Sequence, residues 1–246
     1  MNMRSFFNKE KSHEIHETTK IVIASGAEGS GVSIVSEIIA SSLTKLSNVA
    51  LIELGKPHFY NALNFEKRFL TRGFVDFFEK LRNSERIKPG QGNKYEKINW
   101  IVRKTGDNEP LQTQELFRAL YFPKEEYCVF DCSGLDKATS LSLLAEADIP
   151  VVVIDPLPSK LIETRDFLEK VRVNMPDAVL IVNKMNNGVH KAELSRYLGT
   201  NSFFSISSAL LEYIYKAEYN SELLSSFPES LELLSKTQDM LYNLFQ

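Results

Sequence analysis

The chain has 246 residues, 43% of them hydrophobic and 25% charged, which is enough for one sizeable core and excludes a disordered chain. The formal net charge is −3, so the surface as a whole lacks the basic footprint of a nucleic-acid-binding protein. No apolar run approaches the roughly 20 residues that span a bilayer, and residues 1–19 lack the apolar centre of a signal peptide. We therefore expect a cytoplasmic protein, with a flexible leader over 1–19 and one domain over 20–246.

The first element after the leader is a predicted strand over 20–24, which runs into a glycine-rich turn over 25–33, SGAEGSGVS, and then into a predicted helix. Glycines in such a turn permit positive φ and a close approach of the backbone to a ligand. A turn from a buried strand into a helix N-terminus also directs several backbone N–H groups at one point, which attracts phosphate. The turn fits the P-loop pattern G-x-x-x-x-G-K-[ST] from Gly26 to Ser33, except that Val32 stands in place of the lysine.

Val32 leaves two interpretations of this turn. In a P-loop the lysine supplies the full positive charge on the β- and γ-phosphates, whereas the backbone supplies only dipoles. Without that charge, the turn either binds a nucleotide weakly or serves as a tight structural connection. Ser33 is likewise placed either to hold Mg²⁺ or to act as an ordinary serine in the first turn of the helix.

A short apolar run over 48–54 predicts the second strand, of the type found in parallel sheets that are covered on both faces. Glu53 is the one charged residue of that run and lies near its carboxyl end, where open α/β sheets bind ligands. Its carboxylate either holds Mg²⁺ through water or faces solvent at the strand end. We predict an irregular connection over 56–93 with a helical patch at 74–81, and a loop over 84–97.

The strand predicted over 127–131 ends in Asp131, and small residues follow it as far as Gly134. This pattern has the form of a Walker B strand, in which the carboxylate holds the water around Mg²⁺. Cys128 and Cys132 fall on one strand, roughly 13 Å apart, so we expect them to stay unpaired. The other predicted elements are strands over 98–103, 147–154, 178–183 and 203–206, and helices over 33–46, 111–121, 159–171, 190–198 and 212–246, the last broken near Pro228.

The strand predicted over 178–183 continues into the sequence Asn-Lys-Met-Asn. This sequence is similar to the guanine-reading motif N-K-x-D, but Asn186 replaces the carboxylate that accepts from both N–H groups of the guanine edge. We therefore expect Asn183 to offer its amide to an adenine edge instead.

Strands alternate with helices through most of the chain, which predicts an α/β fold with a doubly wound, mostly parallel sheet and helices on both faces. With the motifs above, residues 20–211 resemble the MinD/ParA family of deviant Walker ATPases, P-loop proteins whose first loop reads S-G-K-G-G-V-G-K-T. The resemblance implies a site for ATP or ADP, with Mg²⁺ held by Ser33, Asp131 and Glu53. The nucleotide-binding residues that it implies are Gly26, Ala27, Glu28, Gly29, Ser30, Gly31, Val32, Ser33, Ile34 and Asn183.

The departures from the family pattern fall on positions that act in hydrolysis. Ala27 replaces the lysine that reaches across a dimer, and Val32 replaces the P-loop lysine. Glu53 replaces the aspartate that positions the attacking water, and Gly55 replaces the second aspartate of that strand. Loss of one preorganised donor typically costs on the order of 10²–10³ in rate, and loss of a cation supplied in trans costs ~10³–10⁵. We therefore predict weak or absent nucleotide binding and little hydrolysis.

These departures favour a pseudo-ATPase that acts as a localisation or assembly module, nucleotide-responsive or purely structural, with protein partners or a second copy of the chain. The degenerate loop resembles that of TadZ/CpaE-like members of the family, which help to place pilus and secretion machines. The alternative is a slow ATPase in partitioning or cell positioning, with a substitute cation from Lys56, Lys160 or Lys184. Residues 231–245 form an amphipathic helix without a basic face, so we expect it to pack on the domain or on a partner helix, and any membrane association to be peripheral.

Overall fold

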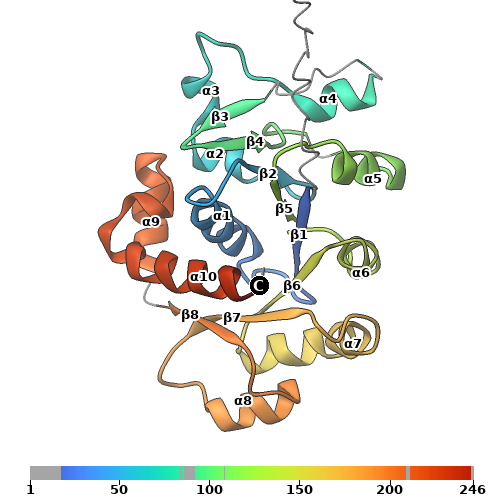
Figure 1. Cartoon of the computed structure of the whole chain (residues 1–246), viewed down its shortest axis with the longest axis vertical. Helices are drawn as coiled ribbons and strands as arrows, with labels where there is room; N and C mark the ends of the chain where they lie inside the picture. Colours follow the sequence, from blue (N-terminus) through green and yellow to red (C-terminus); the bar gives the residue numbers. More distant parts are fainter. Residues whose placement is uncertain (1–17, 84, 86–91, 108, 209–210, 245–246) are drawn as a thin grey trace, which may run out of the picture.

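Eight strands form one sheet, in the order β3-β4-β2-β5-β1-β6-β7-β8, in the computed structural model (Figure 1). The structure describes residues 18–83, 85, 92–107, 109–208 and 211–244, so the predicted leader lies outside the described residues except for Thr18 and Thr19. Every neighbouring pair of strands is parallel except β3 with β4. The strands are β1 (Thr19–Ala24), β2 (Val49–Glu53), β3 (Asn93–Tyr95), β4 (Ile98–Ile101), β5 (Tyr127–Asp131), β6 (Ile149–Ile154), β7 (Val179–Met185) and β8 (Phe204–Ser207).

Helices cover both faces of this sheet. They are α1 (Val32–Leu43), α2 (Phe59–Ala62), α3 (Phe65–Arg68), α4 (Phe77–Arg82), α5 (Thr113–Tyr121), α6 (Lys137–Ala145), α7 (Pro158–Asn174), α8 (Lys191–Leu198), α9 (Leu211–Asn220) and α10 (Leu231–Leu244). Successive side chains of a strand point to opposite faces. Ile21 and Ile23 of β1 therefore belong to the core under α1, α2, α3 and α10, whereas Val22 and Ala24 belong to the core under α4 to α8. The sheet is doubly wound, as predicted.

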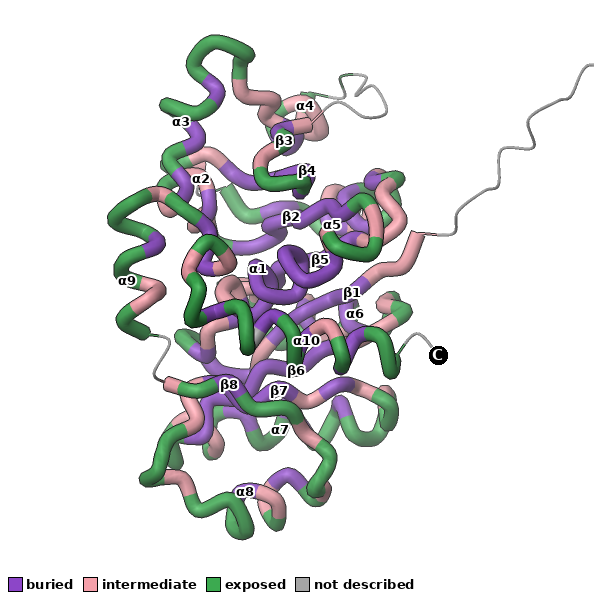
Figure 2. Tube along the Cα trace, turned by 60° about the vertical axis from the view of Figure 1, so that its left-hand side comes forward, coloured by how far each residue is buried: buried purple, intermediate pink, exposed green. Residues whose placement is uncertain are grey.

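Helix α1 lies at the centre of the face of the sheet that α2, α3 and α10 also cover. Figure 2 shows it buried along most of its length, between the sheet and α10. Because the central strands are parallel, their carboxyl ends meet at one edge of the sheet, where open α/β folds place their ligands. The glycine-rich turn joins β1 to α1 at this edge, so the fold places the turn where a ligand is expected.

Three stretches without a predicted element contain regular structure, and the first holds the short helices α2 and α3 in the connection predicted to be irregular. β3 lies in the predicted loop over 84–97, and a tight turn with Glu96 and Lys97 at φ values of 48° and 63° pairs it with β4. α6 follows β5, and Asp136 caps its first turn. Neither β3 nor α6 leaves a clear local signal, because the turn after β3 lacks glycine and α6 is rich in serine and threonine.

None of the described helices has both the length and the apolar character that a bilayer-spanning helix needs. The C-terminal helix α10 buries Leu234, Met240 and Leu241 in the core that it shares with α1. This is the packing on the domain that the sequence favours. Cys128 and Cys132 are buried and free, as predicted.

Candidate functional site

The glycine-rich turn follows β1 at the carboxyl edge of the sheet and ends where α1 begins. Gly31, directly before α1, has a left-handed backbone with φ of 88°. A Cβ built on Gly31 would lie 2.2 Å from Nδ2 of Asn183, and one built on Gly26 would lie 2.7 Å from Cβ of Phe167 on α7. Both positions therefore need glycine for steric reasons.

Polar side chains within the turn hold its shape. The hydroxyl of Ser30 donates to the carbonyl of Ala27 at 2.8 Å, and the hydroxyl of Ser25 donates to Ser30 Oγ at 3.0 Å. The N–H of Ala27 donates to Ser25 Oγ at 3.2 Å. Ala27, at the position of the lysine that would reach across a dimer, is 6% exposed and therefore buried.

The backbone N–H groups at the end of the turn make no hydrogen bond to any residue that the structure describes. The first hydrogen bond of α1 runs from the N–H of Val35 to the carbonyl of Gly31 at 3.1 Å. Within the described part of the chain, no acceptor is found for the N–H groups of Ser30, Gly31, Val32, Ser33 and Ile34. Unpaired N–H groups at a helix N-terminus attract anions, phosphate among them. The backbone half of a phosphate cradle is therefore present.

Val32 adds no charge to this cradle. Its side chain is 6% exposed and packs in the core beneath α1, together with Val35 and Ile21. A lysine at this position would have to leave that core to reach a phosphate. The core therefore accommodates valine at this position, and the charge of the P-loop lysine is absent from the turn.

Asn183, at the carboxyl half of β7, lies against the turn. Its Nδ2 donates to the carbonyl of Ser30 at 2.9 Å, and its Oδ1 accepts from the N–H of Lys184 at 2.9 Å. The amide that we expect to meet an adenine edge is engaged with the turn in this structure. Its contact with a base stays a prediction.

Asp131 and Glu53 lie side by side at the carboxyl ends of β5 and β2. Asp131 is fully buried, and its Oδ1 accepts from the N–H of Ser133 at 2.7 Å. Its Oδ2 has no hydrogen-bond partner among the residues that the structure describes. Burial raises the pKa of Asp131, although the hydrogen bond from the N–H of Ser133 and the nearby hydroxyl groups of Ser33 and Ser133 act to lower it.

The predicted Mg²⁺ ligands Ser33 and Asp131 come together in the structure. The hydroxyl of Ser33 donates at 3.1 Å to Ser133 Oγ, two residues from Asp131. Mg²⁺ prefers oxygen ligands, and the unpaired carboxylate oxygen and the hydroxyl fit that preference. No cluster of three His, Cys, Asp or Glu side chains occurs in the described ranges, so an ion here would also depend on water and on oxygens of the ligand.

Glu53 is fully buried, so the interpretation that its carboxylate faces solvent is wrong. One oxygen accepts from the N–H groups of His58 at 2.7 Å and Phe59 at 3.0 Å, and the other accepts from the N–H of Arg103 at 3.0 Å. Burial raises the pKa of Glu53 to about 8, and the charge of Asp131 adds to this, whereas the hydrogen bonds act to lower it. Both oxygens are bonded to backbone, and a contact with Mg²⁺ stays a prediction.

Solved structures decide the fold. A scan of the sequence against models of protein families finds no match, and neither does a search of curated proteins. A ParA-family ATPase from Chlorobium tepidum TLS superposes with a TM-score of 0.73 at 12% identity, over 91% of this chain and 98% of that chain. The septum site-determining protein MinD from Pyrococcus horikoshii OT3, complexed with Mg-ADP, gives 0.67 at 12% identity, over 93% of this chain and 97% of that chain.

The chain has the MinD/ParA fold. The MinC:MinD cell division protein complex of Aquifex aeolicus contains a further chain of this kind, with a TM-score of 0.66 at 16% identity, over 91% of this chain and 96% of that chain.

Within this MinD/ParA fold, the connection after β2 has no room for the aspartate that Gly55 replaces. A Cβ on Gly55 would lie 1.8 Å from the carbonyl oxygen of Ser133. The buried Arg103, after β4, donates from Nη1 to the carbonyl of Gly55 at 2.8 Å and pairs with Asp107 at 3.0 Å. Sequence reasoning missed Arg103, because a single arginine after a strand carries no local signal.

Of the lysines proposed as substitute cations, Lys184 lies directly at the turn. Its Nζ lies 2.5 Å from the carbonyl oxygen of Gly29. Lys160 pairs with Glu163 at 2.9 Å, and the carboxylate of Glu163 accepts a 3.4 Å hydrogen bond from the N–H of Glu28 in the turn. Lys56, after β2, is exposed.

A cavity of about 770 Å³ opens beside Lys184. It is lined by the connection from β6 to α7, the connection from β7 to α8, and the start of α9, with Leu161 and Tyr197 in its wall. Ligand pockets usually enclose roughly 300–1,000 Å³. The volume of this cavity falls in that range, and Lys184 lies both in its wall and against the glycine-rich turn.

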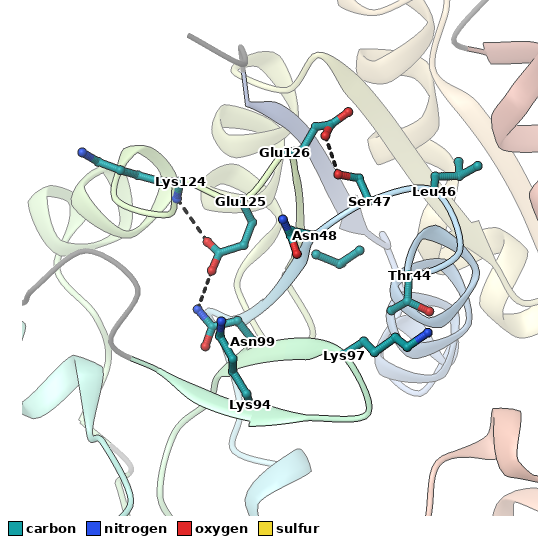
Figure 3. A pocket seen from close by; sticks show the side chains of 11 residues that line it. Thr44, Leu46, Ser47, Asn48, Lys94, Lys97, Asn99, Lys124, Glu125 and Glu126 are labelled. Carbon is teal, nitrogen blue, oxygen red and sulfur yellow. Dashed lines mark hydrogen bonds between the residues drawn. The ribbon is translucent and has the colours of Figure 1, made fainter. Parts of the chain in front are cut away.

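A separate cavity of about 640 Å³ lies at the opposite edge of the sheet, near the amino ends of β2, β4 and β5 (Figure 3). Lys94, Lys97 and Lys124 line it, and the carboxylate of Glu125 accepts a 2.7 Å hydrogen bond from Nδ2 of Asn99 at its wall. Because the glycine-rich turn lies at the carboxyl ends of the strands, this cavity is not part of the candidate site.

Proposed function

We propose that this protein is a MinD/ParA-like pseudo-ATPase that binds ATP or ADP with Mg²⁺ weakly and acts in the cytoplasm as a nucleotide-responsive localisation or assembly module. The observation that carries the proposal is the contrast between two halves of the cradle. Its backbone N–H groups from Ser30 to Ile34 are unpaired within the described chain, whereas the position of the P-loop lysine holds the buried Val32. Backbone dipoles support binding of phosphate, and the missing charge weakens it.

The residues present fit Mg²⁺ beside the phosphates. Ser33 would hold the ion through its hydroxyl, and Asp131 through the oxygen that lacks a partner in the described structure. When bound, Mg²⁺ supplies positive charge to the phosphate oxygens. MinD from P. horikoshii is complexed with Mg-ADP, which supports the same class of ligand for this chain.

Hydrolysis is expected to be slow for two reasons. The lysine that would stabilise the leaving phosphate is absent, and the carboxylate that would orient the attacking water is hydrogen-bonded to the backbone. Ala27 has no side chain that could reach a second copy of the chain. The oxygens of Glu53 accept hydrogen bonds from three backbone N–H groups at 2.7–3.0 Å, so this carboxylate is poorly placed to orient an attacking water. Loss of one preorganised group typically costs on the order of 10²–10³ in rate, and loss of a cation supplied in trans costs ~10³–10⁵.

A protein partner suits this role. The A. aeolicus complex joins a MinD protein to MinC. We propose an analogous use here, with a second copy of the chain or with a component of a pilus or secretion system as the partner. The net charge of −3 gives no support to a nucleic-acid partner.

The first experiment is ATP turnover by the purified full chain with Mg²⁺. We expect no phosphate release above the background of a sample without protein. A rate comparable with those of active MinD or ParA proteins, abolished by Asp131→Ala, would overturn the proposal of a pseudo-enzyme.

The second experiment tests binding by calorimetry with ADP and Mg²⁺. Gly31→Ala should abolish binding, because its Cβ would lie 2.2 Å from Nδ2 of Asn183. Gly73→Ala is the matched control, since Gly73 also has a positive φ (73°) but no atom within 4 Å of its added Cβ. Absence of binding by the unmodified chain would leave only the purely structural form of the module.

A slow ATPase that acts in partitioning or cell positioning is the second candidate. Lys184 is the best candidate for the substitute cation, because its ammonium group contacts Gly29 in the turn, whereas Lys56 and Lys160 make no hydrogen bond to the turn in the described structure. Turnover that exceeds the background and falls in Lys184→Met would favour this enzyme over the pseudo-ATPase.

A further inference from the structure

Two adjacent residues of β7 bond two adjacent carbonyl groups of the glycine-rich turn. Nζ of Lys184 donates to the carbonyl of Gly29 at 2.5 Å, and Nδ2 of Asn183 donates to the carbonyl of Ser30 at 2.9 Å. In the described chain, Lys184 carries the one ammonium group bonded directly to the turn. β7 and the turn are 153 and 155 residues apart at these contacts, so only the tertiary fold brings them together.

Because the peptide unit is planar, these contacts also fix the direction of the N–H groups on the opposite side of the turn. In a trans peptide the C=O and the N–H of the same unit point in opposite directions. Because the carbonyl of Gly29 points toward Lys184, the N–H of Ser30 points away from it. The carbonyl of Ser30 points toward Asn183, and the N–H of Gly31 therefore points away in the same manner.

Those two N–H groups belong to the set without an acceptor in the described structure. A free turn would rotate these peptide units among several orientations, and a ligand would have to order them when it binds. Groups that are already oriented avoid this cost, which is the general advantage of preorganisation. The advantage matters more in this chain, because Val32 leaves the backbone N–H groups as the main source of attraction for phosphate.

The backbone of Lys184 is strained in the position that makes these contacts. Its φ is 59°, in the left-handed region, and the pairing of β7 with β8 is irregular between Val182 and Met185. Such a backbone is unfavourable for a residue other than glycine and is found at ligand clamps. Asn183 supports it by accepting from the N–H of Lys184, and Asp155 supports the ammonium group at 2.6 Å.

We infer that Asn183 and Lys184 are positioning residues that form a clamp, which turns the N–H groups of Ser30 and Gly31 toward the phosphate of a bound nucleotide. The identity of the anion as a nucleotide rests on the proposed function. The clamp itself concerns the geometry of the turn in the free protein, so it can be tested without a nucleotide.

The test follows the backbone amide resonances of Ser30 and Gly31 in the free, full-length protein labelled with ¹⁵N. Lys184→Met keeps the length of the side chain and removes the ammonium group, so the Ser30 resonance should shift and its amide hydrogen should exchange faster. Asn183→Ala should shift mainly the resonance of Gly31. The variant loses the hydrogen bond to the carbonyl of Ser30, which belongs to the same peptide unit as the N–H of Gly31. Lys184→Arg should restore the Ser30 resonance, and Lys170→Met, on the exposed face of α7, should leave both unchanged.

The same variants are then titrated with ADP and Mg²⁺. Lys184→Met should bind about tenfold more weakly than the unmodified chain, with recovery in Lys184→Arg. Unchanged Ser30 and Gly31 resonances in Lys184→Met and Asn183→Ala, with the fold intact by circular dichroism, would overturn the clamp. Failure of the unmodified chain to bind nucleotide would instead count against the proposed function, and the resonances of the free protein would still decide the clamp.

Discussion

The side chain of Glu37, on α1, accepts a hydrogen bond from the backbone N–H of Leu224, 187 residues further along the chain. Glu37 is 6% exposed. Burial raises its pKa to about 7, the hydrogen bond from Leu224 acts to lower it, and the nearby carboxylate of Glu218 adds to the increase. The connection between α9 and α10 is therefore held on α1 by a carboxyl group that titrates near neutral pH.

Stability should fall as the pH rises through the pKa of Glu37. The folded chain holds the proton up to about pH 7, whereas the unfolded chain releases it near 4.5, so folding is favoured most below pH 4.5 and loses this contribution by about pH 7. Glu37→Gln keeps an acceptor for Leu224 and removes the charge. At pH 8 the variant should be more stable by roughly 1–3 kcal/mol.

Urea unfolding between pH 5 and pH 8 measures this effect. The exposed Glu169→Gln, on α7, is the matched control and should keep the pH dependence of the unmodified chain. Some decline will remain in Glu37→Gln, because the pKa of Glu53 is also raised, to about 8. Identical pH profiles for Glu37→Gln and the unmodified chain would contradict the assignment.

Structure that depends on neighbouring residues leaves a signal in the sequence, whereas contacts between residues far apart in the chain do not. The apolar runs that end in the glycine-rich turn and in Asp131 predict the central strands correctly, because burial on both faces leaves a local signal. The sequence alone leaves two interpretations of Glu53, because the N–H groups that bond its carboxylate come from two other segments. The contacts of Lys184, Arg103 and Glu37 depend on the tertiary fold and leave no local signal.

Val32→Lys should restore nucleotide affinity to the cradle. A charge-assisted hydrogen bond to phosphate typically contributes about 1.5–3 kcal/mol, which corresponds to roughly 10–100-fold tighter binding of ADP with Mg²⁺. The same change should lower the free energy of unfolding by roughly 1–3 kcal/mol, since the side chain of Val32 leaves the core. Calorimetry and thermal unfolding measure the two effects on one sample.

Val32→Met serves as the control for the longer side chain without the charge. It should bind ADP no better than the unmodified chain. Equal affinities for Val32→Lys and Val32→Met would mean that a phosphate does not reach the unpaired N–H groups, which would favour the turn as a purely structural connection.

Asp131→Asn should separate folding from metal binding. The buried Asp131 carries an oxygen without a partner in the described structure, and burial raises its pKa. Asparagine keeps an acceptor for the N–H of Ser133 and removes a buried charge, so the free energy of unfolding at pH 8 should rise by roughly 1–3 kcal/mol. Nucleotide affinity should at the same time become equal in Mg²⁺ and in EDTA. A variant that still binds more tightly with Mg²⁺ would exclude Asp131 as a ligand of the ion.

The C-terminal helix α10 should behave as a structural part of the domain. Leu241 is 0% exposed in the core shared with α1, whereas its neighbour Tyr242 is 58% exposed. Leu241→Ala should lower the free energy of unfolding by about 2–5 kcal/mol, and Tyr242→Ala should change it by no more than about 0.5 kcal/mol. Because Leu234, Met240 and Leu241 of α10 are already buried in the core, the intact chain should not float with anionic vesicles. Flotation that disappears on removal of residues 231–246 would show instead that this face leaves the domain to bind lipid, and the packing on α1 would then be only one of two states.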